Sequence, residues 1–470
     1  MTKKSKSSRR EFIVSTGMAT AGLAFGSSGL KSFGAPYGAG ILGSNEKIRV
    51  GFIGVGNRGS QLLHLFMSQP DCEVAALCDV YEPYMTRDRS TVHPRHINDM
   101  DGRIPRMGEQ FPDTVRQYAD YRDLLEDKSI DAVCIATPDH WHCLQTIHAI
   151  QSGKDVFVEK PLTITIKEGR MMVDAGRNSK QIVAVGLNRR GSVTYQKLSR
   201  EIPAGKIGKV TCAFASRINN MYPDGIGKQK PEDAPDNFNW DAWVGPRAYR
   251  PYQYNIAPYM FRWWSDYSSQ MGNWGVHYMD VIRWMMNEQA PVAISAHGGN
   301  FAVDDDRDIP DTMHVTYEFA SGSIVTFSIY EASSNRFIPY GEVELRGTRA
   351  SLFAGEGGYR IMPTSRGQFQ TWDKLADAEE FTPGDEMLAD GSSRNSTLNL
   401  VRNFLDCVKS RNTPLCTLED GHRSTSFAHL GNIALATGQR LRWDPVNEIF
   451  PGNEEANRLL HYEYRKPYVL

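Results

Sequence analysis

The fold of this chain is decided by Lys47-Ile-Arg-Val-Gly-Phe-Ile53, a short apolar run, and by Gly54-Val-Gly56-Asn57-Arg58-Gly59, which follows it directly. The apolar run predicts a buried strand, and Gln61 to Met67 beyond it predicts a helix. In such a unit the first glycine permits a tight turn, the second lets backbone approach a pyrophosphate, and the third allows close helix packing. The helix N-terminus then faces the phosphate charge. This context predicts a dinucleotide site, with a purely structural turn as the alternative.

A carboxylate beyond the loop bears on which dinucleotide binds. Asp79 lies twenty residues past Gly59, at the end of the next apolar run. This is where an acidic side chain binds the ribose hydroxyls in dinucleotide folds. Its charge disfavours a 2′-phosphate, which favours NAD, but Arg58 could pair with such a phosphate. We therefore expect NAD, with NADP as the alternative.

The order of predicted elements gives the fold class. Strands alternate with helices over residues 47–165, which predicts an α/β, N-terminal Rossmann domain with a parallel, doubly wound sheet. Residues 166–440 contain many strand-like runs separated by hairpin signals such as Ala320-Ser-Gly322. They predict a C-terminal α+β domain with a large, mostly antiparallel open sheet for substrate binding and oligomerisation. Residues 441–470 are expected to form a C-terminal tail around the body.

Two further segments fall at the carboxyl edge of the predicted parallel sheet, where ligands bind in this architecture. Thr137-Pro138-Asp139-His140-Trp141-His142 follows one strand, and Glu159-Lys160-Pro161 follows the next. His140 and His142 are candidates for contact with the nicotinamide or its ribose, although His140 could instead cap the next helix. A lysine beside a cationic ring and partly removed from water should have a lowered pKa, which lets it share a proton.

A predicted helix supplies a second candidate for proton transfer. Its segment Gly275-Val-His277-Tyr-Met-Asp280 places His277 and Asp280 three residues apart, and Asn273 lies four before the histidine. These spacings put the three side chains on one face. A histidine there can take a hydroxyl proton while hydride leaves the same carbon. The alternative is a core histidine with a carboxylate partner in its own helix.

Together these segments resemble the Gfo/Idh/MocA family of sugar-type oxidoreductases, which pairs a Rossmann domain and an E-K-P lysine with a G-x-H-x-x-D helix. The resemblance covers nearly everything after the N-terminal signal and extends to Gly186-Leu-Asn-Arg-Arg190, Ala428-His-Leu-Gly-Asn-Ile433 and Glu455-Ala-Asn-Arg-Leu459. These last pieces look like the twin-arginine-exported branch. The resemblance implies that Lys160 and His277 handle the proton, that Asp280 orients the site, and that the protein is a homodimer or homotetramer. Sugar dehydrogenases of the family have an aspartate where this chain has Asn273, and an amide cannot act as a base.

An aromatic segment, residues 219–267, fits a sugar pocket, since sugar rings lie on aromatic faces while their hydroxyls seek polar neighbours. The alternative is that these rings fill an interface. The acidic run Asp304-Asp-Asp-Arg-Asp308 is better explained as a solvated loop than as a calcium site, and we expect no metal. The residues expected to contact the substrate are Arg189, Arg262, Asn273, Trp274 and His277.

The N-terminus predicts export. Ser8-Arg9-Arg10-Glu11-Phe12-Ile13 and the mild apolar stretch after it are typical of a twin-arginine signal, assigned to residues 1–35, with a glycine-rich linker at 36–46. That route moves folded proteins, so we expect a periplasmic protein that meets the twin-arginine export machinery and keeps its seven cysteines reduced. A formal charge of −2 and no basic stripe argue against nucleic-acid binding. No apolar run is long enough for stable membrane insertion.

The expected function is oxidoreduction of a sugar or cyclic polyol hydroxyl by an NAD(P)-dependent enzyme. Free NAD should be scarce outside the inner membrane, so we expect a tightly bound cofactor. One alternative is a redox-assisted NAD-dependent glycosidase or lyase of the same fold, to which Cys78-Asp79-Val-Tyr81 is similar. Against this alternative, the E-K-P lysine that such glycosidases tend to lose is intact. A non-catalytic sugar- or nucleotide-binding module is the remaining alternative.

Overall fold

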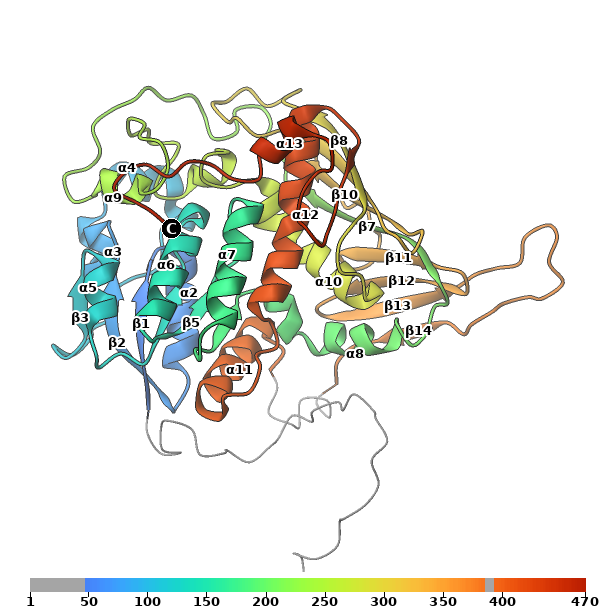
Figure 1. Cartoon of the computed structure of the whole chain (residues 1–470), viewed down its shortest axis with the longest axis horizontal. Coiled ribbons are helices and arrows are strands. Elements are labelled where there is room, and N and C mark those ends of the chain that lie inside the picture. The colour runs from blue at the N-terminus through green and yellow to red at the C-terminus, as the bar shows by residue number, and fades with distance from the viewer. Residues whose placement is uncertain (1–46, 385–392) are drawn as a thin grey trace, which may run out of the picture. The chain divides into compact units, whose positions relative to one another are not determined.

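The computed structural model describes residues 47–384 and 393–470. The predicted signal, residues 1–35, and the predicted linker, residues 36–46, lie outside the described residues. The described part builds one sheet of six strands and one of nine (Figure 1). This arrangement confirms the predicted fold class, a parallel Rossmann sheet followed by an α+β domain.

The first sheet is parallel throughout, with the strand order β3-β2-β1-β4-β5-β6. Its central strands are apolar along their length because helices cover both faces, and Val50 and Phe52 of β1 are fully buried. The sheet continues past residue 165, where the sequence analysis ended the domain, because β6 is its last strand. The strands are β1 Ile48–Ile53, β2 Cys72–Cys78, β3 Arg116–Tyr118, β4 Ala132–Ile135, β5 Asp155–Val158 and β6 Val183–Val185.

Helices connect and cover this sheet. Phe66 of α2, Phe157 of β5 and Phe404 of α11 meet edge to face, which fixes α2 and α11 against the sheet. Helix α7 begins at a capping box in which Thr165 and Glu168 bind each other's backbone N–H groups. The helices are α2 Asn57–Met67, α3 Glu82–Thr86, α4 Pro94–Met100, α5 Tyr121–Glu126, α6 His142–Gln151, α7 Ile166–Arg177 and α11 Ser396–Ser410, with short turns η1 Arg89–Thr91, η2 Asp101–Arg103 and η3 Asp139–Trp141.

The second sheet has the order β14-β13-β12-β11-β7-β10-β9-β8-β15, and β7 with β10 is its parallel pair. Helices α8, α10 and α12 share one apolar core with its strands. β15 belongs to this sheet, so the expected tail contributes to the domain before it leaves it. The strands are β7 Val210–Ile218, β8 Ala293–Gly299, β9 Thr312–Glu318, β10 Ile324–Tyr330, β11 Val343–Gly347, β12 Ala350–Gly355, β13 Gly358–Pro363, β14 Glu379–Phe381 and β15 Leu441–Arg442. The helices are α8 Val193–Glu201, α10 Val276–Met286, α12 Leu418–Thr437 and α13 Glu454–Arg458, with turns η4 Asn188–Gly191 and η6 Met271–Gly275.

One long segment joins the two halves. Residues 219–268, here named the crossing loop, include α9 Trp240–Val244 and the turn η5 Met260–Trp263. The loop pairs with the chain after β2, where Asn239 N donates to Val80 O at 2.9 Å and Glu82 N donates to Asn237 O at 3.0 Å. The crossing loop therefore covers part of the carboxyl edge of the first sheet.

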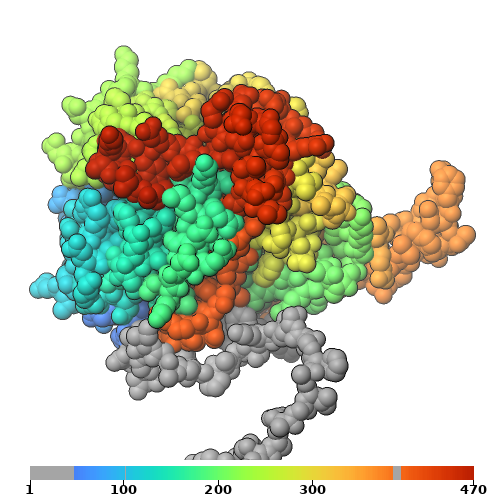
Figure 2. Space-filling view, viewed as in Figure 1, coloured from blue at the N-terminus to red at the C-terminus, as the bar shows by residue number. Residues whose placement is uncertain are grey.

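The C-terminal tail runs back over the first domain. After α13 it crosses over the N-terminal ends of α7 and α6, and the space-filling view shows it lying on this side of the first domain (Figure 2). Tyr464 Oη donates to Glu168 Oε1 at 2.6 Å, and the ring of Tyr468 meets Trp141 edge to face. These contacts bring the end of the chain to the carboxyl edge of the first sheet.

Candidate active site

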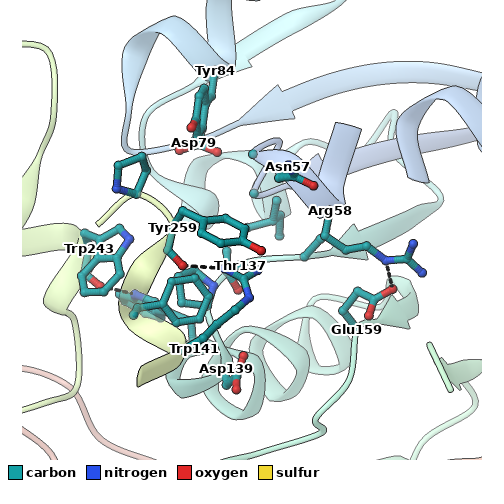
Figure 3. A pocket seen from close by; sticks show the side chains of 18 of the residues that line it. Asn57, Arg58, Asp79, Tyr84, Thr137, Asp139, Trp141, Glu159, Trp243 and Tyr259 are labelled. Carbon is teal, nitrogen blue, oxygen red and sulfur yellow. Dashed lines mark hydrogen bonds and ion pairs between the residues drawn. The ribbon is translucent and has the colours of Figure 1, made fainter. Parts of the chain in front are cut away.

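A cavity of about 850 Å³ opens where the strands of the first sheet end (Figure 3). Its walls come from the glycine loop, from the chain after β2, β4 and β5, from the crossing loop and from the start of α10. Segments from both domains therefore enclose one space. Of the predicted site residues, those that line it are Gly54, Gly56, Asn57, Arg58, Asp79, Thr137, Pro138, Glu159, Lys160, Arg189, Arg262, Asn273, Trp274 and His277.

The glycine loop takes the form that its sequence predicts. Gly54 has φ +84°, a conformation that favours glycine. A Cβ on Gly59 would lie 2.0 Å from Gly54 O, so α2 packs against the turn more closely than any side chain allows. Gly56, the N-cap of α2, provides no side-chain cap, which leaves the first N–H groups of the helix for an anion.

Asp79 is fixed beside this loop by backbone donors. Its Oδ2 accepts from Val55 N at 2.8 Å and its Oδ1 accepts from Tyr81 N at 3.0 Å. Burial raises its pKa, while the backbone N–H groups act in the opposite direction. The carboxylate therefore faces the cavity in a fixed orientation, and each oxygen keeps lone pairs for a ribose hydroxyl.

Arg58 does not present a free charge. Its Nε donates to Glu159 Oε1 at 2.8 Å, as Figure 3 shows, and its Nη1 donates to Gln61 Oε1 at 3.0 Å. Glu159 is 3% exposed. The arginine considered as a partner for a 2′-phosphate is therefore neutralised by its own chain, which agrees with NAD as the cofactor.

Some residues of the segment after β4 line the cavity, and others are buried behind it. Thr137, Pro138, Asp139 and Trp141 line the cavity, but His140 and His142 are not among its described lining residues. His140 Nε2 lies 2.9 Å from Trp243 O, and burial lowers the pKa of His140 to about 3. The nitrogens of His142 lie 2.7 Å from Pro161 O and 2.9 Å from Thr137 O. We therefore correct the expected cofactor contacts: both histidines hold backbone segments together because their rings point into the protein.

Lys160 crosses from the first domain to the second. Its Nζ donates to Asn273 O at 2.8 Å and to Asn273 Oδ1 at 3.1 Å. Burial lowers the pKa of Lys160 to about 8, although the nearby carboxylates of Glu159 and Asp139 act in the opposite direction. The expected lowering of this pKa is confirmed, and the amine can exchange a proton near neutral pH.

His277 lies on the same cavity in the first turn of α10. Its side chain is buried, and Nδ1 has no hydrogen-bond partner among the described residues. Burial holds the pKa of His277 well below its usual value, and the charges of Arg189, Lys160 and Arg58 lower it further. The ring is therefore neutral, with an unpaired polar atom next to the cavity.

Asp280 does not reach the cavity. Arg190 donates to both of its carboxylate oxygens, from Nε at 2.9 Å to Oδ2 and from Nη2 at 2.8 Å to Oδ1. Ser424 Oγ donates to Oδ1 at 2.7 Å. Asp280 is buried in an ion pair that joins α10 to η4 and α12, so we correct its inclusion among the catalytic residues: it can orient the site by positioning the helix that carries His277, but its carboxylate does not line the cavity.

The predicted substrate residues differ in how far their side chains are already bound to other groups of the protein. Arg189 is held by Glu342, with Nε at 2.7 Å and Nη2 at 2.6 Å from its carboxylate oxygens. Arg262 donates from Nη1 to Tyr259 O at 2.7 Å and stacks on the Tyr259 ring. Trp274 packs near His277, with ring centroids 6.3 Å apart. Arg262 and Trp274 are thus placed for ligand contact, whereas Arg189 serves mainly to brace the wall.

The aromatic rings of the crossing loop fall into two sets by location. Phe238, Trp243, Tyr259, Phe261 and Trp263 line the cavity. Others, such as Trp240, Tyr252 and Tyr254, pack behind them in the first domain's core. The first set lies where a ligand could contact it, and the second set is part of an apolar core.

The acidic run after β8 is only partly the solvated loop that we expected: Asp304 and Asp308 are exposed, but Arg307 and the side chain of Asp305 are buried. Asp305 is fully buried and binds Arg307, while Asp305 Oδ2 also accepts from Ile226 N at 2.7 Å. Asp306 accepts from Gln229 N at 2.7 Å. The run fastens the crossing loop, and in the part of the chain that the structure describes no cluster of three or more His, Cys, Asp or Glu side chains could hold a metal ion.

Several lining residues were not predicted from the sequence, namely Tyr84, Arg103, Arg217, Glu331 and Tyr468. They come from segments without a motif, so no local signal marked them. Arg217, at the end of β7, is the residue that strand position could have indicated. Also, no helix within residues 47–384 or 393–470 meets the length and hydropathy needed to span a bilayer, and all seven cysteines are free thiols, six of them buried.

The fold and this site define a two-domain nucleotide-binding oxidoreductase. Residues 48–187 match the model of the oxidoreductase family with an NAD-binding Rossmann fold, and residues 251–441 match its C-terminal alpha/beta domain. The chain therefore belongs to the Gfo/Idh/MocA oxidoreductase family, and its cofactor is NAD.

Individual relatives agree with this assignment. A glycosyl hydrolase family 109 protein of Shewanella baltica is 31% identical over 184 residues, which cover 37% of this chain and 38% of the relative. The chain thus matches less than half the length of such curated relatives. An oxidoreductase domain protein from Kribbella flavida has TM-score 0.61 at 16% identity, covering 84% of this chain and 99% of that one. A levoglucosan dehydrogenase in complex with NADH and levoglucosan has TM-score 0.59 at 16% identity, with the same coverage.

The cavity fits NAD by its own chemistry. Gly54 and Gly56 line the cavity without side chains, so the backbone is open to a ligand, and the uncapped start of α2 offers N–H groups to a diphosphate. Asp79 supplies the acceptor for ribose hydroxyls. Gly54, Gly56, Asn57 and Asp79 would therefore hold the dinucleotide.

Proposed function

We propose that this protein is an NAD-dependent oxidoreductase that moves hydride between a hydroxyl-bearing carbon of a sugar or cyclic polyol and a tightly held cofactor. One observation carries the proposal: Lys160 and His277, from different domains, line the same cavity as the glycine loop. The fold shared with a levoglucosan dehydrogenase and the aromatic wall of the cavity support a carbohydrate substrate. When bound, NAD supplies the carbon that accepts or returns hydride.

The side chains of His277 and Lys160 differ in their affinity for a proton. The pKa of His277 lies well below its usual value, whereas that of Lys160 is about 8. A proton removed from the substrate hydroxyl is therefore held more firmly by Lys160. His277 accepts a hydrogen bond from that hydroxyl and orients it, and the neutral Lys160 amine takes the proton. In the reverse direction the Lys160 ammonium returns it.

Asn273 completes this arrangement. Its backbone and amide oxygens both accept from Lys160 Nζ, which fixes the amine beside α10. An amide in this position orients the lysine and does not compete for the proton. A carboxylate would compete for it. Because Asn273 replaces the family aspartate and cannot act as a base, Lys160 and His277 are the residues left to handle the proton.

Two measurements test the proposal. Replacement of His277 by Ala should lower turnover of every accepted sugar by about 10²- to 10⁴-fold, and unchanged turnover would refute its role. Mass spectrometry of denatured, as-purified protein should recover one NAD per chain. Its absence would refute tight retention.

A second candidate is supported by the relatives named glycosyl hydrolase family 109 protein. Hydride removed and returned within one cycle acidifies a neighbouring C–H bond and allows a glycosidic group to leave. The intact Lys160, bound to Asn273, favours net oxidoreduction instead. Release of the aryl group from aryl glycosides without added NAD would favour the glycosidase.

We also propose, from the arginine pair Arg9-Arg10, that the chain is exported by the twin-arginine route to the periplasm. The free, buried thiols suit a protein that folds before export. A homodimer or homotetramer is proposed from the family resemblance. Fractionation of cells with and without that export machinery tests the localisation, and light scattering tests the assembly.

A further inference from the structure

The arginines on the cavity wall fall into two groups. Three are neutralised by carboxylates of the chain: Arg58 by Glu159, Arg122 by Asp120 and Arg189 by Glu342. The other three are Arg103, Arg217 and Arg262, and none of them forms an ion pair within the described part of the chain. The cavity wall therefore carries three positive charges that no carboxylate of the described chain neutralises.

The unpaired group surrounds two aromatic rings. Arg262 Cζ lies 4.3 Å and Arg103 Cζ 5.2 Å from the centroid of Tyr259. Arg217 Cζ lies 3.8 Å from the centroid of Trp274, the ring beside His277. Stacking orients each guanidinium but leaves its N–H donors available at the edges of the plane.

Two of these charges are costly without a partner. Nε of Arg217 is buried and has no hydrogen-bond acceptor in the described structure. Burial lowers the pKa of both Arg217 and Arg262, yet a guanidinium stays protonated in proteins. Both side chains are half-buried and neither has an ion-pair partner in the described structure, so an anion entering the cavity would gain a charge-assisted contact with a partly desolvated guanidinium.

The neighbouring carboxylates do not fill this role. Glu331 accepts from Arg307 Nη1 at 2.6 Å and from Trp263 Nε1 at 2.8 Å. Asp139 is buried and accepts from Ser268, and its pKa is raised by burial. Both line the cavity, but each is already engaged elsewhere and repels an anion less than a free carboxylate would.

We propose that Arg217 and Arg262 form a subsite for an anionic group of the substrate, so that the enzyme acts on acidic sugars bearing a carboxylate or a phosphate. The subsite adjoins the reacting groups, because Trp274 links Arg217 to His277 and the charge of Arg262 is felt at Lys160. The inference rests on the proposed function and names its substrate class.

The cofactor's diphosphate is the other anion that this cavity takes, and among the three unpaired arginines Arg103 is the one whose backbone is bonded to the glycine loop. Its backbone oxygen accepts from Asn57 Nδ2 at 2.8 Å, which ties it to the glycine loop. Arg217 instead extends from β7 on the side of Trp274. Substitutions of Arg103 and Arg217 therefore separate a diphosphate contact from a substrate contact.

The first experiment needs no variant. Full-length, NAD-loaded protein is assayed with glucose, glucuronate and glucose 6-phosphate, and with galactose and galacturonate, while binding is followed by calorimetry. We expect at least one acid to exceed its neutral partner by about 10- to 100-fold in kcat/KM or in affinity, the size of a charge-assisted contact. Neutral sugars equal to the acids, or no binding by any acid, would overturn the subsite.

The second experiment assigns the effect. Arg217→Ala should lower the ratio of kcat/KM for the acid to kcat/KM for its neutral partner by about 10-fold or more, and Arg217→Lys should restore part of that ratio, since charge without the planar fork remains. The matched control Arg440→Ala, an exposed arginine paired with Glu318, should keep the preference. If Arg217→Ala lowers acidic and neutral substrates alike, or releases NAD, the subsite is overturned. An acid preference that persists while His277→Ala stays active would refute the proposed function and not the subsite.

Discussion

The glycine loop and the crossing loop wall the same cavity, but they are held in place by different means. The glycine loop is fixed by the strands beside it, as in the bond from Gly54 N to Cys78 O at 2.8 Å. The crossing loop is fixed by side chains far along the chain, such as Asp305 and Asp306, which accept from Ile226 N and Gln229 N. The comparison teaches that the glycine loop is held by local backbone geometry, whereas the crossing loop is held by hydrogen bonds from residues far along the chain.

The largest effect is expected where the two walls meet. Lys160→Met keeps the length of the side chain but removes the amine that Asn273 holds. We expect kcat to fall by about 10²- to 10⁴-fold because proton transfer is lost, while bound NAD stays at one per chain. Steady-state kinetics together with the NAD content of the same sample checks both. A variant that loses its NAD would place Lys160 in the nucleotide wall instead.

The crossing loop can be loosened without touching the cavity. Asp305→Ala leaves the buried Arg307 without that partner, and we expect a loss of about 3–5 kcal/mol in the free energy of unfolding, with cleavage in residues 219–268 under limited proteolysis. Urea unfolding measures the first and mass spectrometry of fragments the second. Asp304→Ala is the matched control, since that carboxylate is 80% exposed, and it should behave as the parent. Equal stability of the two variants would contradict the contrast between the walls.

The glycine loop should respond to a single methyl group. Gly59→Ala places Cβ 2.0 Å from Gly54 O, and backbone cannot move aside as a flexible side chain would. We expect about 1–3 kcal/mol of destabilisation and loss of retained NAD. Gly357→Ala, where a Cβ meets nothing within 4 Å, is the control. Retention of NAD by the Gly59 variant would show that the close approach is not needed for binding.

The smallest effect comes from pH. Because the pKa of Lys160 is about 8, the neutral amine that accepts a proton becomes more abundant as pH rises to 8 and is the main form above it. We expect kcat/KM for oxidation to rise through this range and level off, and that for reduction to fall. Profiles from pH 6 to pH 10 check the sign. An oxidation rate that falls across this range would mean that the ammonium form is the active one.

The sequence was sufficient for the parts governed by local rules. It placed Gly54, Asp79 and Lys160 on the cavity because a glycine turn and the ends of parallel strands have fixed positions in a doubly wound sheet. It failed for His140 and His142, since a position after a strand does not determine which way a ring points. Their burial behind the cavity follows from contacts with Trp243 and Pro161.

Long-range pairing explains the remaining differences. Asp280 has the helical spacing of a site residue, but its charge is taken by Arg190, from a segment ninety residues earlier. Arg217 belongs to no motif and reaches the cavity from the end of β7, whereas Tyr259 lies on the crossing loop, which the acidic run after β8 helps to hold in place. Ion pairs and hydrogen bonds between residues so far apart in the chain cannot be predicted from one sequence.

The bond between Lys160 and Asn273 has a mechanical consequence. It joins the end of β5 in the first domain to η6 in the second, so any motion that moves these two segments apart to exchange sugars must stretch or break it. The amine would then become hydrated, and its affinity for protons would rise. Opening and closing would thus switch the base off and on, which keeps proton exchange confined to the loaded, shut enzyme.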